Sequence, residues 1–556
     1  MNTDVAIIGA GPAGCVLANR LSASGRERVL LIEAGSDTPP GDEPPEVRDL
    51  FGPSASGDPR FLWNELKVRW RPGTPEKRYE QGRVMGGGSS INAMWALRGM
   101  PGDYDGWEAA GAKGWSWSAV KPWFMKLERD EIAHPDHGTD GPFPLKRLPR
   151  EAWPPFARAY AAAIERAGFP YVHDLNTDFA DGFGPVPLNA TAAARVSAPM
   201  AYLGAEVRRR ANLSIRCGVR GARVLLDGQC VRGVEVIANG RHEAIAASRV
   251  FLCAGAFQSP AILMRSGIGP AADLQSLGIA PARDLPGVGA NLHDHPYIYI
   301  GMHLKRAAKQ SLALRSWVSG CFRYSSRLPD CPPTDMMVTM LNKTMWHPLG
   351  QRIGASGVSL YKSFSRGRVR LASPDPLAMP AIDFNQLEDA RDIRRMVLGL
   401  RLVYRLLADP GVAALRNEVF AATFSEEVRE MMRPTVKSWL KAVAATILLD
   451  GPAPLRRGLI DRFITQGFDL GAVIDDDDRL AEHIRANAVG MFHPVGTCRM
   501  GAGDDRMAVV DAACRVHGID GLSVVDASVM PAIPRGNTHF PTLMIAEKIG
   551  ALESAR

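Results

Sequence analysis

Two histidines near the end of the sequence have the surroundings expected of catalytic groups. His493 lies in GMFHPVGTCRMG, residues 490–501, and His539 lies in GNTHFPT, residues 536–542. Histidine titrates close to neutral pH, so it can take a proton from a reacting group. Two neighbouring histidines could divide this work, one taking the proton and the other orienting the reacting group. The alternative is that both are ordinary core residues.

A dinucleotide-binding fingerprint opens the chain. The apolar run DVAII, residues 4–8, is followed by a glycine turn and a helix-like segment, and a second apolar run ends at Glu33. The turn contains Gly9, Gly11, Pro12, Ala13 and Gly14. This order predicts a strand, a turn against a pyrophosphate, a helix, and an acid that binds ribose hydroxyls. The fingerprint fits FAD, NAD or NADP, and its place at the start of the chain favours FAD.

Further segments must position these groups. QGRVMGGGSSINAMWALRG, residues 81–99, is too rich in glycine for a helix or strand interior and predicts backbone lying against a flat or charged group. Residues 193–255 alternate short β-type runs with turns, which indicates an antiparallel meander. A second strand–glycine–helix unit covers residues 249–269, a core strand covers 522–526, and a helix begins near Pro541. Residues 301–485 are inserted between these nucleotide-type elements.

Composition excludes several classes of protein. The 556 residues are 46% hydrophobic with a formal charge of +7 and no clustered basic stretch, so nucleic acid is not an expected partner. No run of 18 apolar residues predicts a membrane span, and no secretory signal opens the chain. Eight cysteines form no CxxC pair, which favours a reduced, cytoplasmic protein. HDHP at 293–296 and DDDD at 475–478 lack a complete ligand set, so no metal is expected.

The sequence resembles the glucose–methanol–choline (GMC) oxidoreductase family of flavoproteins over nearly its whole length. Blocks that carry the resemblance are the fingerprint with Glu33, GRVMGGGSSINAMWALRG, GAFQSPAILMRSGIG, SRGRVRL, FHPVGTCRMG and VVDASVMPAIPRGNTHFPT. Within the family, YEQGRVMGGGSS and the preceding PPEV and FLWNEL are most similar to bacterial 5-hydroxymethylfurfural and aryl-alcohol oxidases. The resemblance implies an α/β (α+β) fold, in which a Rossmann-type FAD-binding domain carries an inserted substrate-binding domain with an antiparallel sheet flanked by helices.

The resemblance also implies an interleaved domain order. The FAD-binding domain is expected to take residues 1–150, 191–300 and 486–556, the last of these with the catalytic histidines. The substrate-binding domain is expected to take a segment at 151–190 and the main insertion at 301–485.

Site residues follow from the same resemblance. His493 is the expected base, and His539 is expected at the second position of the catalytic pair, where family members carry asparagine or histidine. Some members link the flavin covalently through a histidine at the position of Ile91, so FAD is expected to bind noncovalently here. Besides Glu33 and the glycine turn, the expected FAD contacts are Ala34, Trp63, Val84, Gly88, Asn92, Ala93, Met94, Trp95, Val219, Asp526, Ala527, Phe540 and Pro541.

The predicted reaction is FAD-dependent oxidation of a primary alcohol, with O2 or a quinone-type acceptor reoxidising the flavin. Trp63, Trp95, Phe492 and Phe540 lie in or beside the family blocks, so an aromatic or furanic alcohol is favoured. Trp346 and His347 are further candidates for the pocket wall. Alternatives are a choline or aliphatic-alcohol dehydrogenase, a hydroxynitrile lyase that does not use flavin redox chemistry, and a non-catalytic flavin-binding protein. A light-driven fatty-acid decarboxylase is disfavoured by the presence of His493.

Overall fold

A parallel sheet forms the centre of one half of the molecule. The computed structural model describes residues 3–311, 313–422, 426–433 and 435–555. The sheet has the order β24-β13-β1-β2-β9, built from β24 (Leu522–Val524), β13 (Arg249–Leu252), β1 (Val5–Ile8), β2 (Val29–Ile32) and β9 (Leu213–Arg216). β1 and β2 are completely buried, as expected for parallel strands covered on both faces.

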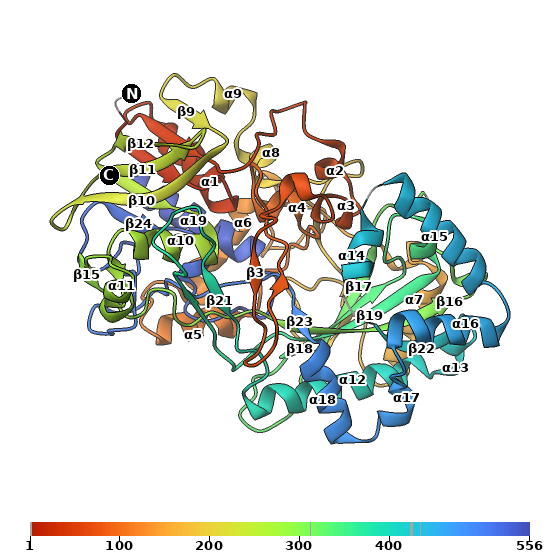
Figure 1. Ribbon diagram of the computed structural model, residues 1–556. Coiled ribbons are helices and arrows are strands. Elements are labelled where there is room, and N and C mark those ends of the chain that lie inside the picture. Colours follow the sequence, from red (N-terminus) through yellow and green to blue (C-terminus); the bar gives the residue numbers. More distant parts are fainter. Residues whose placement is uncertain (1–2, 312, 423–425, 434, 556) are drawn as a thin grey trace.

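Helices on this sheet come from three distant parts of the chain. They are α1 (Pro12–Ser22), α10 (Gly255–Arg265) and α19 (His539–Ser554). Arg20 of α1 forms an ion pair with buried Glu547 of α19, so the first and last helices are joined directly. Beside the sheet lies the expected meander, a three-stranded antiparallel unit of β10 (Val219–Asp227), β11 (Cys230–Ala238) and β12 (Arg241–Ala246). Figure 1 shows both chain ends in this half.

A seven-stranded antiparallel sheet forms the other half. Its strands are β22 (Arg416–Ala422), β16 (Pro296–Leu304), β19 (Ile353–Leu360), β18 (Met336–Leu341), β17 (Val318–Tyr324) and β7 (Gly182–Pro185) in that order, with β23 (Val489–Gly490) paired to β16. β7 comes from the segment before the nucleotide-type strands β9 to β13, so the chain crosses between the halves more than once. β16 begins at Pro296, slightly before residue 301, where the main insertion was expected to begin.

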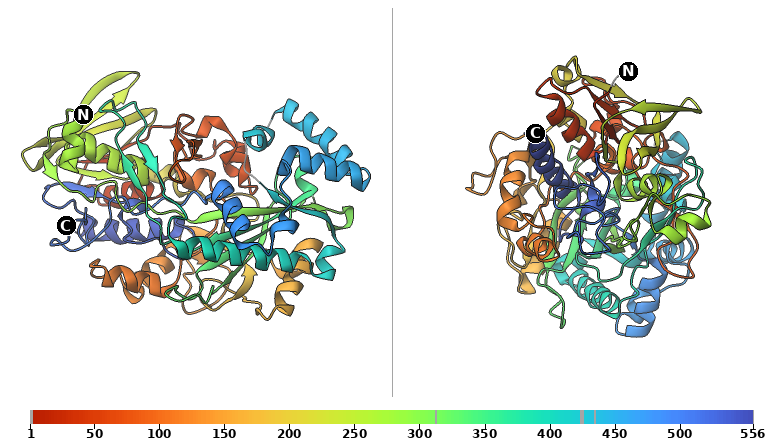
Figure 2. Two further views of the ribbon diagram at one scale, coloured as in Figure 1. Left: turned by 60° about the horizontal axis from the view of Figure 1, so that its bottom comes forward. Right: turned by 90° about the vertical axis from the view of Figure 1, so that its left-hand side faces the viewer.

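The two faces of the antiparallel sheet have different roles because side chains alternate along a strand. Ile298, Ile300 and Met302 of β16 pack in a core with α7 (Pro155–Arg166), α12 (Ala390–Leu407) and α18 (Asp477–Asn487). Tyr297 and Tyr299 point to the opposite face, toward a cavity. α15 (Val436–Leu449) and α16 (Ala453–Ile460) lie at the end of the molecule far from the chain termini (Figures 1 and 2).

The predicted fold class is confirmed, because a Rossmann-type parallel sheet and an inserted antiparallel sheet flanked by helices are both present. The DDDD stretch begins α18, where Asp476 caps the helix by accepting from the Arg479 N–H, as expected for an acidic helix start. Among the described residues, none of the helices combines the length and apolar character needed to cross a bilayer.

Candidate active site

One large cavity connects the two halves of the molecule. Its volume is about 840 Å³, and its wall runs from Gly11 of the glycine turn to the Tyr299 face of the antiparallel sheet. His493, Asn537 and His539 line its middle part. A dinucleotide on the first half and a small molecule on the second half would therefore share one continuous cavity.

The glycine turn fits a pyrophosphate. A Cβ on Gly9 would lie 2.6 Å from the Cys253 carbonyl oxygen, and a Cβ on Gly14 would lie 2.0 Å from the Gly9 oxygen. These two glycines let the strand, turn and helix pack closely. Gly11 differs, since a Cβ there would meet only the Cys253 oxygen at 3.7 Å and Gly11 itself lines the cavity. Its backbone is thus open to a ligand at the N-terminus of α1.

Glu33 fits the ribose of a dinucleotide. Its buried carboxylate lines the cavity and accepts hydrogen bonds from the Ala10 N–H at 2.9 Å and the Gly35 N–H at 2.8 Å. Burial raises the pKa of Glu33 to about 7. Each oxygen keeps a lone pair for a donor, and paired ribose hydroxyls are such donors. Ala34 and Val219 line the cavity beside it, where an adenine would follow the ribose.

The second glycine-rich segment, residues 81–99, packs against the first glycine turn. Gly86 and Gly87 have φ values of 90° and 50°, and a Cβ on Gly87 would lie 3.2 Å from the Gly11 Cα. After the short helix α4 (Gly88–Ile91), Asn92 lines the cavity, and its Oδ1 accepts from an Arg195 guanidinium N–H at 2.8 Å. The segment that the sequence analysis placed against a flat or charged group therefore does form cavity wall.

Most of the expected cofactor residues line the cavity, and five do not. Those in the wall are Gly9, Gly11, Pro12, Ala13, Glu33, Ala34, Trp63, Gly88, Asn92, Ala93, Trp95, Val219, Asp526 and Ala527. Those absent from it are Gly14, Val84, Met94, Phe540 and Pro541. Gly14 and Val84 are packed behind the wall, and the Phe540 ring packs against Phe143 with centroids 5.7 Å apart. Contact of these five residues with FAD stays a prediction.

His493 belongs to a chain of hydrogen bonds that fixes its tautomer. The Nε2 atom of His295 lies 3.1 Å from the Pro534 carbonyl oxygen, which can only accept, so His295 carries its proton on Nε2. The Nδ1 atoms of His295 and His493 are 2.9 Å apart. With a lone pair on His295 Nδ1, His493 must carry its proton on Nδ1. The Nε2 atom of His493 then carries the lone pair that can accept a proton.

Asn537 faces this base. Its side-chain Nδ2 lies 3.1 Å from His493 Nε2, while its Oδ1 accepts from the Tyr361 hydroxyl at 3.2 Å. The Tyr361 bond sets the amide orientation, so that the NH2 group points to His493. Tyr361 also stacks on His295, with ring centroids 4.5 Å apart and planes 5° from parallel. Both neighbours of His493 are thereby held by the same tyrosine.

Asp294 fixes the backbone of both histidines. One carboxylate oxygen accepts from the His295 N–H at 2.7 Å and from the His493 N–H at 3.0 Å. The carboxyl group is buried, and burial raises its pKa to about 7. HDHP thus positions His493 through His295 and Asp294. His293 points elsewhere, with Nε2 2.9 Å from Asn291 Oδ1, so the two histidines of this motif do not converge on one metal position.

His539 does not occupy the expected second position of the pair. The hydrogen-bond partner of His493 there is Asn537, whereas a catalytic role for His539 stays a prediction. His539 is the first residue of α19 and lines the same cavity, and neither ring nitrogen has a hydrogen-bond partner within the described part of the chain. Trp346 and His347 are absent from the wall, and His347 Nε2 lies 3.2 Å from the Met431 carbonyl oxygen instead.

The histidines of the site are neutral at physiological pH. Burial lowers the pKa of His493 to about 3, and burial together with the charge of Arg195 lowers that of His539 to about 3. Burial also holds the pKa of His295 well below its usual range. The expectation of a base that titrates near pH 7 therefore does not describe this buried site, where desolvation penalises the charged ring.

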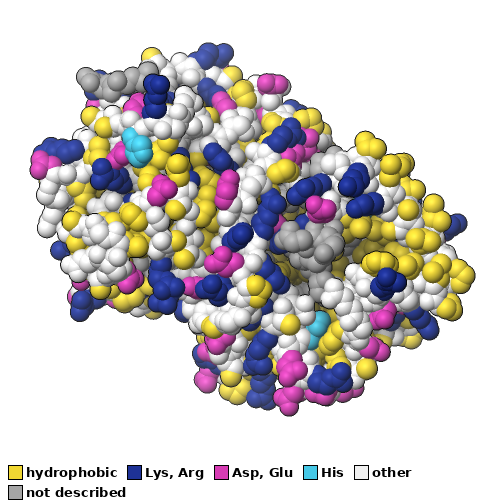
Figure 3. All heavy atoms as spheres, in the orientation of Figure 1, with side chains coloured by type: hydrophobic (Ala, Val, Ile, Leu, Met, Phe, Trp, Pro, Cys, Tyr) yellow, Lys and Arg dark blue, Asp and Glu magenta, His cyan; other side chains and the backbone are white. Residues whose placement is uncertain are grey.

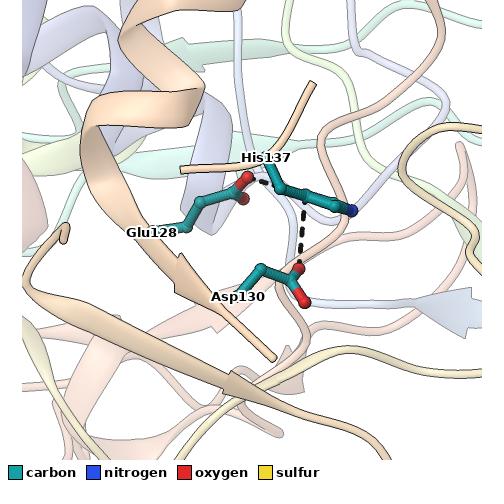
Figure 4. Close-up of side chains that lie close together, drawn as sticks. All are labelled: Glu128, Asp130 and His137. Carbon is teal, nitrogen blue, oxygen red and sulfur yellow. Dashed lines mark hydrogen bonds and ion pairs between the residues drawn. The ribbon is translucent and has the colours of Figure 1, made fainter. Parts of the chain in front are cut away.

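A second cluster of titratable groups lies outside the cavity. Glu128, Asp130 and His137 place ligand-type atoms close together, as Figure 4 shows, in a metal-like arrangement. The His137 ring, however, already bridges carboxylates, with Nδ1 2.9 Å from Glu128 and Nε2 2.9 Å from Asp174. A ring that donates from both nitrogens is a cation, and a cation does not bind a metal.

Charge balance supports the same interpretation. Arg98 pairs with Glu128, and Arg147 pairs with Asp130 at 2.6 Å and with Asp174 at 2.8 Å. Three carboxylates thus face two guanidinium groups and one imidazolium. Burial alone would lower the pKa of His137, but hydrogen bonds from the ring to Asp174 and Glu128 outweigh it and raise this pKa to about 9. The cluster is a buried ion network.

This network predicts a loss of stability at alkaline pH. Because the folded-state pKa of His137 lies near 9 and the unfolded value is about 6.5, its contribution is complete below pH 6.5. It is lost as pH rises through 9. His137→Gln should cost about 3 kcal/mol of unfolding free energy at pH 6. Exposed His134 offers the matched control His134→Gln. Thermal unfolding from pH 6 to 10 checks this, since the gap between native and His137→Gln proteins should shrink with pH.

A parallel sheet with a dinucleotide fingerprint, and a second sheet that shares a cavity lined by a neutral histidine, are the parts of a dinucleotide-dependent oxidoreductase. The chain matches the two GMC oxidoreductase domains over residues 4–297 and 363–546. It belongs to the GMC oxidoreductase family, which confirms the resemblance, and it is an FAD-dependent alcohol oxidase or dehydrogenase.

Individual relatives are similar to this protein over nearly the whole chain. It is 39% identical to 5-(hydroxymethyl)furfural oxidase of Methylovorus sp. (strain MP688), over 98% of this chain and 97% of that protein. It is 32% identical to an oxygen-dependent choline dehydrogenase of Photobacterium profundum, over 99% and 92% of the two chains. Among solved structures, pyridoxine 4-oxidase from Mesorbium loti has a TM-score of 0.81 at 29% identity, and the match covers both chains completely.

Proposed function

We propose that this enzyme oxidises a primary aromatic or furanic alcohol to the aldehyde, and that His493 Nε2 accepts the hydroxyl proton. The observation that carries the proposal is a neutral, half-buried histidine in the cavity wall whose unprotonated Nε2 lies beside the Asn537 amide. FAD, held by the glycine turns and Glu33, supplies the hydride acceptor when bound. O2 or a quinone-type compound then takes the electrons.

The residues of the chain divide the proton chemistry between them. His493 takes the hydroxyl proton at Nε2, and Asn537 donates an Nδ2–H to the alcohol oxygen, where negative charge grows as the proton leaves. The imidazolium that forms keeps its Nδ1–H bonded to neutral His295. An alcohol bound in this part of the cavity would place its hydroxyl proton within reach of Nε2.

The cavity wall favours flat substrates. Trp63, Trp95 and Phe492 line it, as do Tyr299 and Trp317, whereas Phe540 is packed outside. Aromatic walls bury flat rings and stack on them, which favours benzylic or furanic alcohols over short aliphatic ones. The 39% identity to a 5-(hydroxymethyl)furfural oxidase supports the same substrate class.

The proposal is tested by anaerobic mixing of the FAD-loaded enzyme with benzyl alcohol, 5-hydroxymethylfurfural, choline and ethanol. Bleaching of the oxidised-flavin absorbance by the aromatic and furanic alcohols, with a kcat/KM at least roughly tenfold above that for ethanol, is the expected result. Equal values for all four alcohols would remove the substrate argument. No bleaching by any alcohol would favour a hydroxynitrile lyase or a flavin-binding protein. Repeating turnover in air and with a quinone dye identifies the acceptor.

Noncovalent FAD binding gives a separate prediction. Ile91 lines the cavity and has no nucleophilic atom, so the position used for covalent linkage in some relatives cannot form the bond here. Acid precipitation of the purified yellow protein should release all the flavin into the supernatant, where chromatography should identify FAD. Yellow colour that stays with the denatured pellet would show a covalent bond from another residue.

His295 is proposed as a positioning residue for His493. His295→Phe keeps an aromatic ring against Tyr361 but removes the Nδ1 acceptor, so the His493 tautomer is no longer fixed. We expect kcat to fall roughly 10- to 100-fold, the scale for losing a group that orients a catalytic imidazole, while KM and FAD content stay unchanged. His293→Phe is the matched control, because His293 is equally buried in the same motif and does not contact His493. Equal losses in both variants would indicate a packing role.

A further inference from the structure

Large apolar side chains are exposed at one end of the molecule. Among the described residues, seven of the twelve exposed large apolar side chains fall within residues 436–463. They are Val436, Trp439, Leu440, Ile447, Leu448, Leu455 and Phe463, and we call them the α15–α16 patch. Figure 3 shows hydrophobic side chains gathered over this end of the molecule. The other five are scattered, whereas a contiguous apolar patch marks an interaction surface.

On α15 the large apolar side chains face the solvent, and small side chains face the protein. Its buried residues are Ser438, Ala442 and Leu449, so the side facing the protein is narrow and mostly small. Val436 and Ile447, by contrast, are 76% and 69% exposed on the solvent side. A surface helix normally turns its large apolar residues toward the core. Exposure of these residues therefore needs an apolar partner.

The patch is continuous with the wall of the cavity. Leu448 and Phe463 belong to the patch and also line the cavity, and Leu449, Leu459 and Ile464 extend the apolar wall inward. The apolar side chains of the patch thus lie at the edge of the cavity. A partner that covers the patch therefore also lies next to the cavity.

Charges on the patch favour an anionic partner. Lys437, Lys441 and Arg462 are exposed on the same segment, and Arg457 is also exposed while it contacts Glu418. On the acidic side, Asp461 is exposed, and Asp450 is already paired with Arg352. Cations thus outnumber free carboxylates around the apolar side chains. Tryptophan, leucine and isoleucine bordered by lysine and arginine are the composition of segments that lie in a lipid headgroup region.

We propose that the α15–α16 patch docks on an anionic lipid surface and presents the cavity to the bilayer. Lipid chains would cover the apolar side chains, and headgroup phosphates would pair with the lysines and arginines. A second copy of the chain fits less well, because a two-fold contact sets the same patch against itself and brings Lys437 and Lys441 near their own counterparts. The patch is thus a surface for peripheral binding, with no segment crossing the bilayer.

Vesicle binding by the full-length FAD-loaded protein tests the proposal. Native protein should co-sediment with phosphatidylcholine vesicles that contain about one third phosphatidylglycerol, and less with phosphatidylcholine alone. Binding should weaken as salt rises from about 0.1 M to about 0.5 M, because screening reduces the charge contribution. The double variant Leu440→Gln/Ile447→Gln should bind at least about tenfold less, since both side chains leave the apolar interface. Neither residue lines the cavity, so alcohol oxidation by the variant in vesicle-free buffer should be unchanged.

The matched control replaces exposed apolar residues that lie outside the patch. Leu377→Gln/Leu552→Gln changes two exposed leucines outside the patch and should bind vesicles as the native protein does. Failure of the native protein to bind anionic vesicles, or equal binding by the Leu440→Gln/Ile447→Gln variant, would overturn the proposal. Light scattering on the same samples identifies the competing occupant. A native dimer that the patch variant converts to a monomer would assign the patch to a second copy of the chain and would also overturn it.

Discussion

His493→Ala should slow anaerobic reduction of the bound flavin by an alcohol roughly 100-fold or more, the usual scale for loss of a general base. The only change at the reacting hydroxyl is the missing Nε2 lone pair. Flavin content should stay near that of the native enzyme, because the dinucleotide end of the cavity is formed by the glycine turns and Glu33. Stopped-flow mixing with benzyl alcohol measures the rate.

A buried histidine outside the cavity provides the control. His483 of α18 has a pKa that burial lowers to about 4, and it is absent from the cavity wall. His483→Ala should therefore reduce its flavin at the native rate, even if it unfolds at a lower temperature. A normal rate of reduction in His493→Ala would show that the imidazole is not the base.

The same base gives a pH profile. Because burial lowers the pKa of His493 to about 3, the ring is neutral and able to accept a proton throughout the range from about pH 5 to about pH 9. Native reduction rates should therefore be nearly flat over this range and fall only in acid. An inflection between pH 7 and 8 that disappears in His493→Ala would show that bound FAD or substrate raises this pKa.

The nucleotide half was predictable because its determinants are local. β1 and β2 are uninterrupted apolar runs, and Gly9 and Gly14 are required by backbone contacts within one strand–turn–helix unit. Glu33 ends the next strand at the expected distance, and it does line the cavity. The α12 helix and the meander could also be predicted, since each depends on the periodicity of a single segment.

The hydrogen-bond network around the base could not be predicted from local patterns. His295 and His493 are 198 residues apart in the chain, and they meet because β23 pairs with β16 and brings the two loops together. Considered alone, the spacing of the two histidines in HDHP is one that can bind a metal. Nothing in that motif states that a proline carbonyl from residue 534 fixes the His295 tautomer.

The pKa of His493 was missed for a related reason. The value expected for a histidine applies in water, and desolvation depends on every segment that surrounds the ring. No sequence pattern around residue 493 reports that burial. The sequence likewise does not show that Asn537, rather than His539, hydrogen-bonds to His493, because the direction of each side chain decides this and not its position in the motif. α19 begins at His539, so Asn537 lies in the turn before the helix.

Asn537→Ala should cost roughly 100-fold in the rate of flavin reduction, the scale for removing one donor that stabilises developing negative charge on oxygen. The Asn537 amide is the group that faces His493 Nε2, and Tyr361 fixes its orientation. His539→Ala, two residues away, should retain a rate within about threefold of native once FAD is bound, since His539 makes no hydrogen bond in the described structure.

Further substitutions at position 537 separate the loss of the hydrogen-bond donor from the loss of side-chain packing. Asn537→His should recover much of the lost rate, because an imidazole N–H can replace the amide donor and family members carry either residue at the second position of the pair. Asn537→Leu has a similar volume without a donor and should remain as slow as Asn537→Ala. Should His539→Ala lose 100-fold while Asn537→Ala stays near native, the second catalytic group would be His539, as the sequence alone suggested. Both residues line the same cavity two positions apart, so each variant is a matched control for the other when their rates are compared at equal FAD content.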